Sequence, residues 1–65
     1  MDIGGTLKSL RLARNLTQED LADRCELTKG FISQVENNLT SPSIATLIDI
    51  LEALGTNLRD FFNES

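Results

Sequence analysis

The sequence has no histidine and a single cysteine, so it is poor in the residues that build most metal sites and disulfides. It also lacks tryptophan and tyrosine, and no grouping of a nucleophile with a base points to an enzyme. A chain of 65 residues has room for one small core. We therefore expect a single domain over residues 1–65 that is not an enzyme, holds no metal or cofactor, and depends on helix packing or a partner subunit for stability.

Long apolar runs are missing as well. No stretch approaches the roughly 20 residues that a membrane span needs, and Met1-Asp2-Ile3 lacks the basic start of a secretion signal. The lone Cys25 is expected to pack as a small apolar residue, which suits a reducing compartment. These features predict a cytoplasmic protein without membrane contact.

Positive charge is scarce, since the formal net charge is −4. Nucleic-acid-binding domains are usually basic, but binding depends on the field of the docking face, not on the total charge. Five of the six cations fall in the first half of the chain, among them Lys8, Arg11, Arg14 and Lys29. We expect a polarised surface on which Lys8 and Arg14 are ordinary solvated charges.

The apolar residues that are present repeat at helical spacing. Ile3, Leu7 and Leu10 predict a helix from Ile3 to Arg14, ended by Asn15 in a left-handed conformation. A second helix then begins at the N-cap Thr17, with Asp20 completing a capping box. Its predicted inward residues are Leu21, Ala22 and Cys25.

Three further helices follow. Thr28 caps a short helix from Lys29 to Asn37 with Ile32 and Val35 inward. Pro42 then either begins the next helix or stands just before a Ser43 cap, and Gly55 ends that helix. Its expected buried residues are Ile44, Leu47, Ile48, Leu51 and Leu54. Asn57 caps a last turn, residues 58–62. Phe61 and Phe62 in this turn have three possible roles: closing the core, forming a two-fold interface, or leading into a further domain. We favour core closure.

The second and third predicted helices are joined by about three residues, as in a helix-turn-helix. Ala22 allows close approach of the two helices and Leu27 fills the turn, while Ile32 and Val35 fix the second helix. A simple helical hairpin is the alternative. The stretch from Thr17 to Asn38 is thus the candidate functional unit.

Four sequence motifs strengthen the prediction of a helix-turn-helix. They are LTQEDLA from Leu16, ISQVE from Ile32, SPSIATL from Ser41 and ALG from Ala53. In order and without gaps, they resemble the phage-repressor and Cro-type (Xre-type) helix-turn-helix family. The resemblance implies a compact, all-α, five-helix lambda-repressor-like domain that binds a palindromic double-stranded DNA operator as a homodimer and regulates transcription, as a repressor. It also extends to N-terminal domains of regulators that carry a C-terminal cupin sensor.

The resemblance also implies roles for individual residues. The recognition helix, residues 28–37, enters the major groove, where its outward Lys29, Ser33 and Gln34 can reach base edges. Phosphate contacts fall to residues at helix ends: Thr17, Gln18, Thr28 and Asn38. Arg11 either touches phosphate or, as the family implies and we favour, forms a structural ion pair with Glu36.

The chain departs from the family at two positions. Glu26 stands where the elbow usually has glycine, which predicts either a positive φ at a cost of order 1 kcal/mol or a different turn. Gly30 leaves a base-reading position without a side chain, and the neighbouring Phe31 is expected to pack inward more readily than to reach a thymine methyl. With the acidic charge, these departures keep open the alternative of a protein-interaction module with little DNA affinity.

Overall fold

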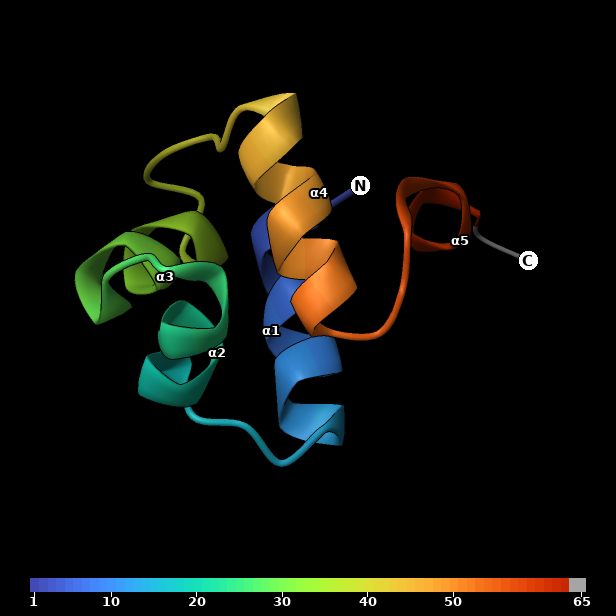
Figure 1. Ribbon diagram of the computed structural model, residues 1–65. Coiled ribbons are helices and arrows are strands. Elements are labelled where there is room, and N and C mark those ends of the chain that lie inside the picture. The colour runs from blue at the N-terminus through green and yellow to red at the C-terminus, as the bar shows by residue number, and fades with distance from the viewer. Residues whose placement is uncertain (64–65) are drawn as a thin grey trace.

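The computed structural model describes residues 1–63 and has five helices and no strand among them (Figure 1). They are α1 (Ile3–Ala13), α2 (Gln18–Cys25), α3 (Lys29–Glu36), α4 (Ile44–Ala53) and α5 (Leu58–Phe62). The predicted all-α, five-helix class is confirmed, although Glu64 and Ser65 of the predicted domain lie outside the described residues. None of these five helices is long and apolar enough to cross a membrane.

The helices pack as two short layers around α4. α2 and α3 lie on one side of α4 and α5 lies on the other (Figure 1). α1 packs on α3, α2 packs on both α3 and α4, and α5 packs on α4. This arrangement leaves the helix pair α2–α3 at one edge of the molecule, with the rest of the chain behind it.

Local sequence chemistry sets where the helices begin. Thr17 and Asp20 form the predicted capping box: the Thr17 hydroxyl accepts from the Asp20 N–H at 3.0 Å, and an Asp20 carboxylate oxygen accepts from the Thr17 N–H at 2.9 Å. The backbone and side-chain hydrogen bonds from Thr17 lower the pKa of Asp20. Thr28, Ser43 and Asn57 cap α3, α4 and α5, as the sequence predicts.

The core gathers one apolar stripe from each helix. Its fully or nearly buried members are Leu7, Leu21, Ala22, Ile32, Val35, Leu47, Ile50, Leu51, Leu54 and Phe61. Leu27 is half-buried and packs against them, as expected of a residue that fills the elbow. The close packing of short helices thus supplies the stability that disulfides or metals provide in other small domains.

The prediction for α4 was wrong at two positions. Ile44 and Ile48 are 65% and 37% exposed, whereas Ile50, which the pattern left out, is buried. α4 packs against α2 on one side and α5 on the other, so its buried arc is shifted toward Ile50. Two adjacent arcs of this helix are apolar, and only the positions of α2 and α5 decide which of them is covered.

The two terminal phenylalanines have different environments. Phe61 is buried and closes the core, as expected, whereas Phe62 is 48% exposed. Their rings meet edge to face, with centroids 5.0 Å apart. α5 is therefore anchored by one aromatic ring and exposes another.

Arg14 is exposed, as the sequence predicts, but it also makes a contact within the fold. Its Nε–H donates to the backbone oxygen of Leu54 at 2.9 Å, and Leu54 is the C-cap of α4. A cation at a helix C-terminus satisfies a free carbonyl and complements the helix dipole. Arg14 thus connects the end of α1 to the end of α4.

Cys25 is half-buried and packs against the core, as expected of a small apolar residue. Its burial, and next the negative charge of Asp49, raise the pKa of the thiol. The thiol therefore stays protonated near neutral pH and is a poor nucleophile.

Gly4 lies where α1 meets the end of α3. A Cβ at this position would stand 2.4 Å from the backbone oxygen of Val35 and 2.6 Å from that of Glu36. The two backbones therefore touch at a point where only glycine fits. The sequence carries no sign of this contact, because the partners of Gly4 lie more than 30 residues away along the chain.

Candidate nucleic-acid interface

α2 and α3 are joined by three residues, Glu26, Leu27 and Thr28, in a tight elbow. Glu26 adopts the left-handed conformation, with φ 58° and ψ 37°, and the Leu27 N–H donates to the Ala22 oxygen at 2.9 Å. The prediction of a positive φ at Glu26 is confirmed, so the elbow keeps its tight form at a cost of order 1 kcal/mol. The buried Ala22 brings α2 close to the turn.

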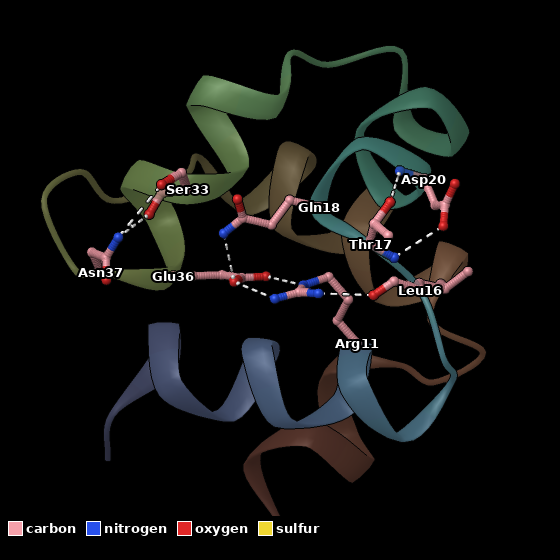
Figure 2. A network of polar contacts seen from close by, with 8 residues as sticks. All are labelled: Arg11, Leu16, Thr17, Gln18, Asp20, Ser33, Glu36 and Asn37. Carbon is pink, nitrogen blue, oxygen red and sulfur yellow. Dashed lines mark hydrogen bonds and ion pairs between the residues drawn. The ribbon is translucent and has the colours of Figure 1, made fainter.

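α3 turns one face inward and the other outward. Ile32 and Val35 are buried, while Lys29, Gly30 and Gln34 are exposed. Ser33 is half-buried, and its backbone oxygen accepts from the Asn37 side chain at 2.9 Å (Figure 2). Phe31 packs against the core, as favoured from the sequence.

Arg11 and Glu36 form a buried ion pair that joins α1 to α3 (Figure 2). Arg11 Nε donates to Glu36 Oε2 at 2.7 Å and Nη2 donates to Oε1 at 3.0 Å, so the contact is bidentate. The hydrogen bonding to Glu36 raises the pKa of Arg11, against the opposing effect of burial. This is the pairing that the family resemblance implies, and it fixes the C-terminal end of α3.

Gln18 at the start of α2 completes the same network. Its Nε2 donates to Glu36 Oε1 at 3.1 Å, and the third guanidinium nitrogen of Arg11 donates to the Leu16 oxygen at 2.8 Å. Within residues 1–63, every buried side-chain nitrogen or oxygen has a hydrogen-bond partner. The network therefore links the three helices that form and support the helix-turn-helix.

Thr17 and Thr28 cap the starts of α2 and α3, where we predict contacts with DNA phosphate. Thr17 Oγ1 accepts from the Asp20 N–H, and Thr28 Oγ1 accepts from the Phe31 N–H at 3.1 Å. Both residues are exposed. A hydroxyl that accepts one hydrogen bond still has its own proton to donate. Each threonine can therefore cap its helix and also donate a hydrogen bond to a phosphate.

Asn38 is committed to the fold. It adopts a positive φ of 59°, its Oδ1 accepts from the Gly4 N–H at 3.0 Å, and its Nδ2 donates to Asp2 Oδ1 at 2.7 Å. This bond and the one from the Gly5 backbone lower the pKa of Asp2. The side chain holds α1 against the end of α3, a role that the sequence gave no means to foresee.

Formal charges around the pair α2–α3 are mixed. α2 exposes three acids, Glu19, Asp20 and Asp23, together with Arg24, whereas Lys29 is the only charged side chain on the exposed face of α3. Lys29 lies in the first turn of α3, where the backbone N–H groups also point outward. The positive character of this face is thus concentrated at the start of α3.

A family model described as Helix-turn-helix matches residues 7–61 of this chain. The chain belongs to the helix-turn-helix family. The resemblance to phage repressors is confirmed, and the simple helical hairpin is thereby excluded.

Proteins similar to this chain include a phage repressor and a bacterial transcriptional regulator. The chain is 31% identical over 64 residues to the immunity repressor protein of Bacillus phage phi105, covering 98% of this chain and 44% of that protein. It is 36% identical over 61 residues to the HTH-type transcriptional regulator PuuR of Escherichia coli, covering 94% of this chain and 33% of that protein. The chain thus spans less than half the length of both relatives.

A solved structure of similar size has the same fold. The restriction-modification controller protein C.AhdI from Aeromonas hydrophila superposes with a TM-score of 0.89 at 30% identity. The match covers 94% of this chain and 92% of that one. The fold described above is therefore shared along nearly the whole of both chains.

Proposed function

We propose that this chain binds double-stranded DNA sequence-specifically and regulates transcription, as a repressor, with α3 in the major groove. The observation that carries the proposal is the exposed face of α3, held rigid by the buried Arg11–Glu36 pair at the edge of a helix-turn-helix. The names of its relatives, an immunity repressor protein and a transcriptional regulator, support it. We place its action in the cytoplasm, which is where the DNA lies in a bacterium such as the one that holds its relative PuuR.

The exposed side chains of α3 have the chemistry needed to read bases. Lys29 can donate to guanine O6 or N7, Gln34 can pair with adenine N6 and N7, and Ser33 suits either a base or a phosphate. Thr17, Gln18 and Thr28 are assigned to phosphate at the helix starts, where backbone N–H groups favour anions. Asn38 is assigned to phosphate as well, because it is exposed and its Nδ2 donates only one of its two N–H groups within the fold.

Replacing Lys29 or Gln34 with alanine should weaken binding to the selected operator while leaving the fold intact. Where the side chain makes a bidentate base contact, the expected loss is about 1–3 kcal/mol, or roughly 5- to 150-fold in affinity. The operator is first selected from random duplex DNA with the unaltered chain, and each variant is then titrated against it.

Arg59→Ala is the matched control for Lys29→Ala. It removes the same charge from α5, which lies on the far side of α4 from α3 (Figure 1). If all three variants bind as the parent chain does, α3 is not the recognition helix. If the parent chain enriches no sequence at all, the alternative of a protein-interaction module replaces the DNA-binding proposal.

We also propose that the operator is palindromic and that two copies bind it as a dimer, because a helix-turn-helix reads half-sites about 34–36 Å apart. Exposed apolar side chains support a contact through α4 and the tail. Ile44 and Phe62 line a groove of about 240 Å³ together with Met1 and Ile3.

Ile44→Ser should weaken dimer formation without unfolding the monomer, because Ile44 is 65% exposed and contributes little to the core. We expect a lower dimer fraction for Ile44→Ser in analytical ultracentrifugation. We also expect its affinity for a full palindrome to fall, while its affinity for a single half-site stays that of the parent chain. Leu12→Ser is the control, since it removes a similarly exposed apolar side chain from α1. Equal dimer fractions in all three chains would place the interface elsewhere.

A further inference from the structure

Three of the four glycines have a reason within the fold. A Cβ at Gly4 would collide with the backbone of α3, and one at Gly5 would stand 2.5 Å from the Asp2 carboxylate that caps α1. Gly55 has a φ of 77°, which side chains rarely adopt. Glycine at each of these places follows from packing or backbone conformation.

Gly30 has no such reason. A Cβ on this residue would meet nothing within 4 Å, and its φ is not in the left-handed region. It is the second residue of α3, and glycine is a weaker helix former than alanine. Within residues 1–63, then, nothing about the fold disfavours alanine, and the helix itself favours it.

The position of Gly30 points outside the chain. It is exposed and lies beside Lys29 on the face of α3 that also carries Gln34. Glycine is the residue that allows a backbone to approach a ligand closely. A gap in the side chains at this point lets another surface reach the backbone of α3.

We propose that Gly30 is a positioning residue for DNA binding, at which the backbone of α3 lies closer to the DNA than a Cβ would permit. This inference rests on the proposed function. The close approach sets the depth of α3 in the groove, and with it the reach of Lys29 and Gln34. The missing side chain is thus a requirement of the docked geometry as well as the loss of one base contact.

The test compares folding and DNA binding in Gly30→Ala. We expect the variant to melt about 4 °C higher, because alanine favours the helix and meets no obstacle. We expect its affinity for the operator selected with the parent chain to fall at least tenfold. Thermal melting by circular dichroism and titration of the labelled duplex measure the two effects separately.

Ala45→Gly is the matched control, because Ala45 is the exposed second residue of α4. It should lower the melting temperature by a similar amount and leave DNA affinity unchanged. A second titration of Gly30→Ala on unrelated duplex locates the close approach: loss on both duplexes indicates phosphate, and loss on the operator alone indicates a base edge. Either result supports the proposal.

Two outcomes would overturn it. A lower melting temperature for Gly30→Ala would mean that the glycine serves the fold, and unchanged or tighter operator binding would mean that the DNA leaves room for a methyl group. Failure of the proposed function is distinct from both. In that case the parent chain itself selects no DNA sequence.

Discussion

Glu36→Gln should lower the free energy of unfolding by about 3–5 kcal/mol, because it leaves the Arg11 guanidinium buried without a counter-charge. A domain of 65 residues has a total stability on the order of 3–10 kcal/mol. The change is therefore large enough to unfold a substantial part of the population. Urea denaturation followed by circular dichroism measures it.

The double variant Arg11→Met/Glu36→Leu separates the charge from the packing. It removes both charges and fills similar volumes, so it should be more stable than Glu36→Gln, although the Leu16 oxygen loses its donor. A loss of less than about 1 kcal/mol in Glu36→Gln would show that the pair behaves as a solvent-screened surface contact. That result would contradict the rigid frame assigned to α3.

Gly4→Ala should destabilise the fold by about 1–3 kcal/mol, even though alanine favours a helix. The added Cβ would stand 2.4 Å from the Val35 oxygen and 2.6 Å from the Glu36 oxygen, and both are backbone atoms with no rotamer to change. α1 must therefore move away from α3. That movement strains the Arg11–Glu36 ion pair and the hydrogen bonds between Asn38 and the start of α1.

The measurement is a urea titration of Gly4→Ala beside Gly30→Ala. The two substitutions have the same chemistry, but a Cβ at Gly4 meets backbone atoms and one at Gly30 meets open space. Opposite changes in the free energy of unfolding are expected. If Gly4→Ala proved as stable as the parent chain, the close contact between α1 and α3 would not be a constraint on the fold.

Most of the helix boundaries could be predicted because their causes are local. The bond between Thr17 and Asp20 spans three residues, and so does that between Thr28 and Phe31, so the sequence itself brings donor and acceptor together. The left-handed conformation at Glu26 followed from the position of the elbow in the family pattern. Such features depend little on the rest of the molecule.

What sequence could not supply depends on contacts between distant residues. Ile50 is buried in place of Ile48 because α2 and α5 cover that side of α4, and periodicity alone allows either arc. The bonds of Asn38 to Gly4 and of Arg14 to Leu54 span 34 and 40 residues. Nothing in the sequence near a polar residue shows that its hydrogen-bond partner lies so far along the chain.

The buried pair also limits how freely the helix-turn-helix can be transplanted. Its carboxylate belongs to α3, but the guanidinium that neutralises it belongs to α1. A segment holding only α2 and α3, grafted onto another scaffold, would therefore bring an orphan anion into the new interior. Engineering of chimeric regulators from this chain should exchange α1 together with the two helices that follow it.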